Sequence, residues 1–118
     1  KNPSKCKVLV MGMTFKENVS DIRNSKVADL VRELMSFSIH VHITDSFASP
    51  NEVAHEYKLA MVDQISEDYD AVVVSVSHDP YKNLTADYFK SIMREEPMLM
   101  DLKGIYNFKD SDIHYWRL

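Results

Sequence analysis

The sequence predicts an α/β domain in which a mainly parallel sheet is flanked by helices. Segments typical of buried strands alternate with segments typical of amphipathic helices, and this alternation builds parallel sheets covered on both faces. The only two glycines, Gly12 and Gly104, each lie just past an apolar segment. Both are therefore expected at one edge of the sheet, where ligands bind in α/β proteins. The predicted architecture is a three-layer, Rossmann-like domain.

The first half of the chain predicts two strands and two helices. Residues Lys7–Met11 are apolar and partly β-branched, as in a buried strand, and a polar loop, Gly12–Ser20, follows. Asp21 is the expected N-cap of the next helix. The apolar face of that helix consists of Val27, Leu30, Val31, Leu34 and Met35, which recur at helical spacing. His40–Thr44 is predicted as a second strand, and Pro50 suits the first turn of a short helix.

The second half predicts three further strands and one helix. Ala71–Val76 has the strongest strand pattern, because all but one of its residues are Val or Ala. Thr85–Arg94 is predicted as a helix capped by Thr85, and its apolar stripe has helical spacing. Met98–Met100 and Ile113–Trp116 are predicted as strands, the last at an edge. Met61–Ile65 fits neither class clearly.

Length and composition restrict the classes of protein to consider. The chain has 118 residues, which allows one domain, predicted at 7–118 after a linker at 1–6. Its net charge of −4 argues against nucleic acid as the main partner, and no apolar run is long enough to span a membrane. The single cysteine, Cys6, excludes an internal disulfide and a cysteine-cluster zinc site. A reducing, cytoplasmic setting is expected.

The loop after the first strand carries the strongest candidate for ligand binding. Lys16 lies four residues past the strand end, where a lysine can bind a phosphate as a point charge. Arg23 is placed in the first helical turn, where a cation opposes the helix dipole and so implies a partner. That partner is either a ligand phosphate or a neighbouring carboxylate, Asp21 or Glu17. The loop lacks the Gly-x-Gly-x-x-Gly pattern of a standard dinucleotide site.

Other polar residues at the expected ligand edge have weaker cases. Lys103, beside Gly104, is a second candidate phosphate cation. Asp45 follows the second strand but lies too far from Gly12 for the usual ribose contact, so a role in capping the following turn is favoured. His78 and Asp79 resemble part of a catalytic dyad, although the nearby proline and tyrosine favour a structural turn. His40 and His42 lack further metal ligands nearby.

The stretch from Gly12 to Ser25 resembles a known family. It reads Gly-Met-Thr-Phe-Lys-Glu-Asn-Val-Ser-Asp-Ile-Arg-Asn-Ser and matches every fixed position of Gly-x-x-Phe-Lys followed by Asp-x-Arg-x-Ser. This pattern begins the C-terminal domain of the UDP-glucose/GDP-mannose dehydrogenase family. The likeness continues to the Asp-Leu-Lys-Gly segment at 101–104 and covers nearly the whole chain. It is closest to the branch that oxidises UDP-N-acetylhexosamines for surface polysaccharides.

This resemblance implies a function for the parent protein. Family members oxidise C6 of a nucleotide sugar from an alcohol to a carboxylate with two NAD⁺. An N-terminal domain holds NAD and the nucleophilic cysteine, a helical central region dimerises, and the C-terminal domain holds the nucleotide end of the sugar donor. The chain is thus expected to be inactive alone, to bind a UDP-sugar, and to work with the other domains of one polypeptide in a homodimer or higher oligomer.

The resemblance also implies roles for individual residues. Phe15 and Lys16 match the family residues that contact the UDP-sugar, and Arg23 matches an arginine that reaches the NAD site across the interdomain cleft. Lys103 falls near a position usually held by a substrate-binding arginine. A lysine there keeps the charge but loses the bidentate fork of a guanidinium. No metal site and no catalytic residue are expected in this chain.

Two alternatives come from other functional classes. A flavodoxin-like regulatory module, such as a phospho-receiver, needs an acidic pair after the first strand, where this chain has Gly12, Met13 and Thr14. A free-standing dinucleotide-binding protein would need the missing glycines.

Overall fold

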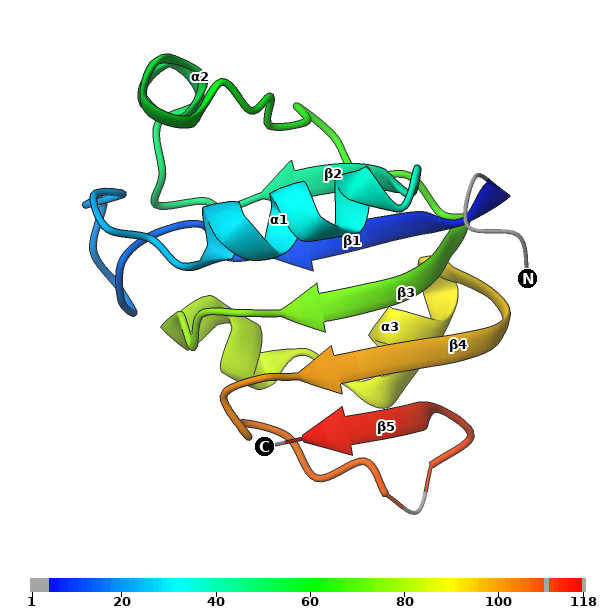
Figure 1. Cartoon of the computed structure of the whole chain (residues 1–118). Coiled ribbons are helices and arrows are strands. Elements are labelled where there is room, and N and C mark those ends of the chain that lie inside the picture. The colour runs from blue at the N-terminus through cyan, green and yellow to red at the C-terminus, as the bar shows by residue number, and fades with distance from the viewer. Residues whose placement is uncertain (1–4, 110, 118) are drawn as a thin grey trace.

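The computed structural model describes residues 5–109 and 111–117, which form one sheet of parallel strands in the order β2-β1-β3-β4-β5 (Figure 1). The strands are β1 (Lys7–Met11), β2 (His40–Thr44), β3 (Tyr69–Val74), β4 (Met93–Asp101) and β5 (His114–Arg117). The helices are α1 (Val27–Ser36), α2 (Pro50–Tyr57), α3 (Ala86–Ser91) and the 3-10 turn η2 (Asp79–Asn83). Within the described residues, no helix is long and apolar enough to cross a membrane.

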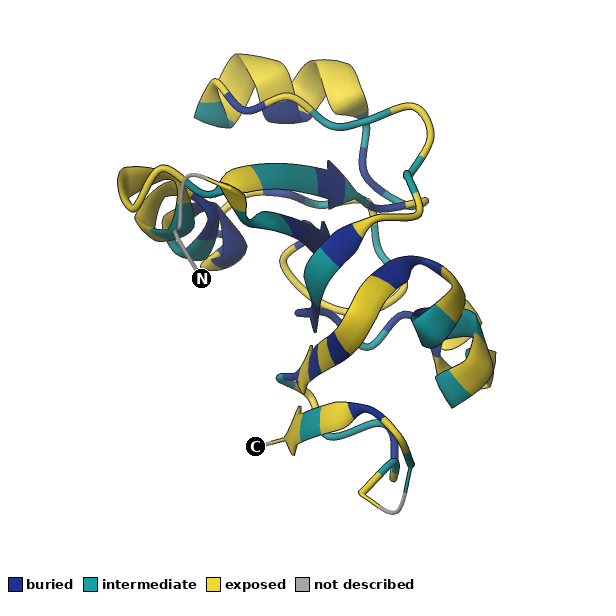
Figure 2. Ribbon diagram, turned by 90° about the vertical axis from the view of Figure 1, so that its right-hand side faces the viewer, coloured by how far each residue is buried: buried dark blue, intermediate teal, exposed yellow. Residues whose placement is uncertain are grey.

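Two apolar layers lie on opposite faces of the sheet, as the alternation along β1 shows. Val8 and Val10 pack into the layer that contains α1, whereas Leu9 and Met11 pack into the layer that contains α3. Successive side chains of a strand point to opposite faces, so a central strand that is apolar throughout needs a cover on both sides. Figure 2 shows α1 and α3 on opposite sides of the sheet, with α2 beyond the β2 edge. The prediction of a three-layer α/β domain is confirmed.

Several predicted boundaries need correction. The helix predicted over Thr85–Arg94 ends at Ser91, because Met93 already belongs to β4. The side chains of Ile92 and Met93 are buried as the helical pattern required, but they enter the core as the chain turns into the sheet. β4 is accordingly longer than the predicted Met98–Met100, whereas Met61–Ile65 is irregular.

The third strand is also displaced, since β3 starts and ends two residues before the predicted Ala71–Val76. Ser75 leaves the strand and donates its hydroxyl to the carbonyl oxygens of Met11 and Gly12, at 3.1 and 2.7 Å. The last strand is His114–Arg117 and not Ile113–Trp116, and it pairs in parallel with β4 at the edge of the sheet.

The ends of β1 and β3 meet at Gly12. This glycine has a φ of +108°, and a Cβ atom there would lie 2.8 Å from both the Cβ and the backbone nitrogen of Val76. Only glycine fits such a close approach. The chain moves to one side of β1 through α1 and to the other side with β3, so this contact lies at the point where the strand order reverses.

Candidate functional site

A pocket of 180 Å³ lies at this reversal point, outside the carboxyl ends of the strands. Four segments line it: the loop after β1 (Thr14, Phe15, Lys16, Glu17), the entry to α1 (Asn24, Lys26, Val27), the end of β3 (Ser75, Val76) and the loop after β4 (Lys103). We call it the lysine pocket. Ligands of doubly wound sheets bind at this place because loops from both halves of the sheet converge there.

Three lysines give the lysine pocket its character. Lys16, Lys26 and Lys103 come from three separate segments, and Glu17 is the one acid in the lining. Within residues 5–109 and 111–117, none of the three lysines forms a salt bridge. Phe15 is 54 % exposed beside them. The arrangement therefore offers positive charge and an aromatic surface to an anion with a flat, apolar part.

The loop that carries Lys16 is anchored by Asp45 at the end of β2. Its Oδ2 atom accepts hydrogen bonds from the backbone N–H groups of Met13 (2.6 Å) and Thr14 (3.1 Å). Its Oδ1 atom accepts from the N–H of Phe47 at 2.8 Å, so the expected capping of the following turn is confirmed. The carboxylate is buried and its oxygens accept from these N–H groups, so its role is to hold the backbone of the two loops in place.

The loop that carries Lys103 is anchored in a similar way by Asp101, at the end of β4. The buried Asp101 carboxylate accepts from the N–H groups of Ile105 (3.1 Å) and Tyr106 (2.8 Å). Gly104 has a φ of +64°, which lets the chain turn back between them. Arg117 of β5 donates to the Gly104 carbonyl oxygen at 2.8 Å. Two buried aspartates at strand ends thus position two of the pocket lysines.

The structure corrects the predicted surroundings of Arg23. The helix α1 starts at Val27 with Lys26 at its N-cap position, so Asp21 is not the N-cap and Arg23 is not in a helical turn. Asp21 instead accepts from Arg23 Nε and Nη2, at 3.0 Å each. Of the partners left open by the sequence, the structure therefore shows Asp21. Hydrogen bonding to Arg23 lowers the pKa of Asp21 to about 2.

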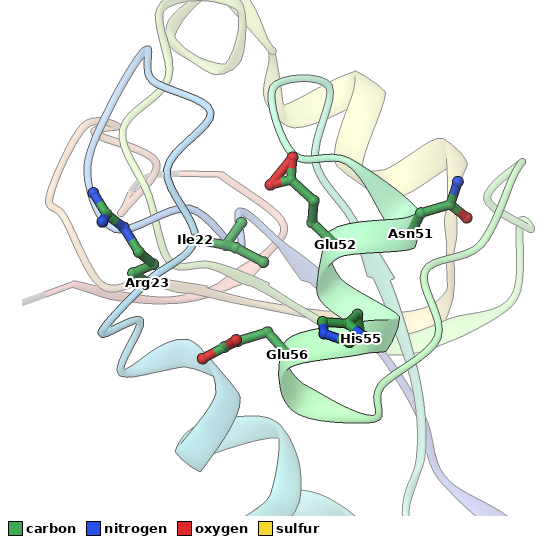
Figure 3. A pocket seen from close by; sticks show the side chains of 6 residues that line it. All are labelled: Ile22, Arg23, Asn51, Glu52, His55 and Glu56. Atoms are coloured by element: carbon green, nitrogen blue, oxygen red, sulfur yellow. The ribbon is translucent and has the colours of Figure 1, made fainter.

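A second pocket, of 320 Å³, is lined by Arg23 and shares no lining residue with the lysine pocket. Its other lining residues are Ile22 and four residues of α2: Asn51, Glu52, His55 and Glu56. Figure 3 shows Arg23 on the loop that faces the acidic side of α2. We call it the α2 pocket. The structure thus brings Phe15, Lys16 and Lys103 together and places Arg23 elsewhere.

Two features of the site were missed from the sequence. Lys26 was overlooked because a helix start at Asp21 would have placed it within the helix, whereas it lies at the entry of α1 and lines the pocket. The signal was the Asn24-Ser25 pair, since Ser25 Oγ accepts from Val27 N at 3.2 Å. His78 is completely buried and contacts Asp45 and the loop after β1, which the predicted structural turn did not foresee.

The comparison with protein families decides the identity. Residues 9–108 match the model described as the UDP-glucose/GDP-mannose dehydrogenase family, UDP binding domain. This chain belongs to that family. The match argues against a receiver module and a free-standing dinucleotide-binding protein, because it runs from Leu9 within β1 past the end of β4 and covers both pocket loops.

Curated relatives and solved structures agree with this assignment. The chain is 39 % identical over 108 residues to the UDP-N-acetyl-D-glucosamine 6-dehydrogenase of Pseudomonas aeruginosa, covering 91 % of this chain and 26 % of the relative. It is 36 % identical to the enzyme of the same name from Salmonella typhi, covering 90 % of this chain and 25 % of that protein. The chain therefore spans about a quarter of the length of these relatives.

The fold matches solved dehydrogenases of this kind. The structure of an NDP-N-acetyl-D-galactosaminuronic acid dehydrogenase from Methanosarcina mazei superposes with a TM-score of 0.86, at 21 % identity, over 99 % of this chain and 25 % of that one. The UDP-N-acetyl-mannosamine dehydrogenase of Staphylococcus aureus gives a TM-score of 0.72 at 26 % identity, over 95 % of this chain and 26 % of that one.

Proposed function

We propose that this chain binds the nucleotide end of a UDP-sugar within a UDP-sugar 6-dehydrogenase. The observation that carries the proposal is the lysine pocket, in which three lysines without carboxylate partners among the described residues meet at the reversal point of a UDP-binding-domain fold. A diphosphate carries the negative charge that would neutralise these lysines. The relatives that share the chain's sequence are dehydrogenases of UDP-N-acetylhexosamines, which supports a substrate of that class.

The proposed roles follow from chemistry and position. Lys16 and Lys103 bind the diphosphate from the loops after β1 and β4, and Lys26 adds a third charge at the helix entry. The exposed ring of Phe15 offers an apolar surface to the uracil or the sugar. A lysine at 103 makes point contacts with phosphate oxygens, in contrast to the bidentate contacts of an arginine.

The remaining steps of the reaction are proposed to lie outside this chain. Residues 7–118 form the nucleotide-sugar domain, and other domains of the polypeptide hold NAD⁺ and remove hydride from C6. Arg23 is exposed on the α2 side, and we propose that it reaches the cofactor from there. The enzyme would act in the cytoplasm, as a homodimer or higher oligomer, in surface polysaccharide synthesis. The chain alone would give no NAD⁺ reduction.

Calorimetric titration of the chain with UDP, UDP-N-acetylglucosamine and NAD⁺ tests the proposal. We expect saturable binding of both uridine nucleotides, and about tenfold weaker binding for Lys16→Ala, which loses a charge-assisted contact. Lys90→Ala on α3 is the matched control, because it removes the same charge from a residue that does not line the lysine pocket. Equal losses in the two variants, or binding of NAD⁺ alone, would contradict the proposal.

A further inference from the structure

One imidazole ring holds both ends of the segment that carries Phe15 and Lys16. The ring of His78 is completely buried. Its Nδ1 atom accepts from the backbone N–H of Asn18 at 2.9 Å, and its Nε2 atom lies 3.2 Å from the hydroxyl oxygen of Thr14. Thr14 and Asn18 bracket the residues 15–17, so two contacts to one side chain fix the entry and the exit of this short segment.

The partners of the ring also fix its protonation. A backbone N–H can only donate, so Nδ1 of His78 must be an acceptor and the imidazole is neutral, with its proton on Nε2. That proton is shared between Asp45 Oδ2, at 3.0 Å, and Thr14 Oγ1. The Thr14 hydroxyl in turn donates to the carbonyl oxygen of Lys16 at 2.8 Å. A chain of hydrogen bonds therefore runs from β2 through His78 to the backbone of Lys16.

The surroundings keep the ring in this orientation. Phe47 packs against it with ring centroids 4.4 Å apart, and Tyr81 meets it edge-on at 5.3 Å. Asn18 has a φ of +60°, and its side-chain oxygen accepts from the Asp79 N–H at 2.8 Å. These contacts hold the buried ring between two aromatic side chains while both of its nitrogens are hydrogen-bonded.

We infer that His78 is a positioning residue for the lysine pocket: it clamps the segment 15–17, with Asp45 holding the clamp, so that Lys16 and Phe15 face the ligand. The inference rests on the proposed function, since it assigns a purpose to the order of that segment. A loop that already has its binding conformation before the ligand arrives binds more tightly, because no conformational entropy of the loop is lost on binding. His78 itself is buried and does not touch the ligand.

Two substitutions distinguish the loss of the hydrogen bonds of His78 from the loss of the packing of its ring. His78→Asn places an amide oxygen near the Nδ1 position and keeps an acceptor for the Asn18 N–H. His78→Gln places its amide near the Nε2 position, keeps a donor toward Asp45, and leaves the Asn18 N–H without its acceptor. Each replaces a buried ring by a smaller amide, so losses of packing are similar. His114→Gln on the exposed face of β5 controls for the chemical change.

The readouts are amide hydrogen exchange at Asn18 and the affinity for UDP, with thermal unfolding to establish that each variant is folded. We expect His78→Gln to remove the protection of the Asn18 amide and to weaken UDP binding about fivefold to tenfold, the effect of one lost hydrogen bond in a preorganised loop. His78→Asn should retain the protection of the Asn18 amide but lose the donor toward Asp45 and Thr14, so its UDP binding should also weaken. His114→Gln should bind UDP as the wild type does. Folded His78→Gln that loses Asn18 protection but binds UDP normally would overturn the inference.

Two further outcomes are also decisive. Failure of the wild-type chain to bind UDP would count against the proposed function, and Asn18 exchange in His78→Gln would still decide whether the ring holds the segment. If His78→Gln does not fold, the wild-type protein gives the answer through scalar coupling between the Asn18 amide and Nδ1 of His78. Observation of the coupling, with a slowly exchanging amide, supports the clamp, and its absence with a rapidly exchanging amide overturns it.

Discussion

The lysine pocket and the α2 pocket are both lined by the segment that connects β1 to α1, but they share no lining residue and differ in charge and in origin. The first gathers three lysines from the ends of β1 and β4 and the entry of α1. The second is larger, 320 against 180 Å³, but two glutamates line it and its one arginine is already paired with Asp21. The comparison teaches that position at the strand ends and unpaired charge, and not volume, distinguish the proposed nucleotide site.

The largest expected effect concerns the glycine that shapes the lysine pocket. Gly12→Ala should lower the free energy of unfolding by about 3 kcal/mol, because a Cβ atom would press on the Val76 backbone and a φ of +108° is strained for alanine. Gly104→Ala is the control: its φ of +64° is a left-handed conformation that costs an alanine about 1 kcal/mol. Urea unfolding measures both, and equal losses would contradict the role assigned to the close approach.

The anchor of the Lys16 loop gives the next effect. Asp45→Asn replaces a buried acceptor of three backbone N–H groups and of His78 by a group that accepts at only one atom. We expect a loss of about 2 kcal/mol in stability, together with weaker UDP binding, since the loop is no longer held. Asp29→Asn on the exposed face of α1 is the matched control. An unchanged UDP affinity in folded Asp45→Asn would show that the anchor does not serve the pocket.

Substitutions of single cations sharpen the comparison between the two pockets. Lys103→Ala should weaken UDP binding about tenfold, whereas Arg23→Ala should leave it unchanged, because the guanidinium lies in the other pocket. Lys103→Arg should bind UDP at least as tightly as the wild type, since a guanidinium binds phosphate with two donors. Calorimetric titration measures all three. A larger effect of Arg23→Ala would place the nucleotide on the α2 side.

The smallest effect is the pH dependence of the Asp21–Arg23 pair. The pKa of Asp21 is about 2 because Arg23 hydrogen-bonds to the carboxylate. A lowered pKa means that the pair stabilises the folded state above pH 3.8, and that this contribution is lost as the pH falls toward 2. In Arg23→Ala the pKa should return toward the ordinary value. Carbon-13 NMR titration of the carboxyl group checks the shift, and an unchanged pKa in the variant would show that Arg23 is not its cause.

The fold was largely predictable from the sequence, because apolar periodicity reports which faces are buried. The sequence pattern could not place the end of α3, because Ile92 and Met93 satisfy a helical spacing although Ile92 caps the helix and Met93 already begins β4. The lysines at 16 and 103 were predictable because both follow strand ends. Lys26 was not, because its place depends on where α1 starts, and Asp21 offered a false N-cap.

The contacts of His78 were beyond sequence reasoning for a different reason. Its partners Asn18 and Asp45 are 60 and 33 residues away, and only the order of β2, β1 and β3 in the sheet brings the three loops together. A histidine followed by Asp79 and Pro80 favoured a turn, which was correct, but the pattern carries no information on what the ring would hold.

A map of amide chemical-shift changes on adding UDP to the ¹⁵N-labelled chain tests the central claim most directly. The account predicts that the largest changes lie at residues 14–17, 26, 75–76 and 103, with little change at residues 51–56 of α2. Changes concentrated on α2 and Arg23, with none in the loops after β1 and β4, would contradict it.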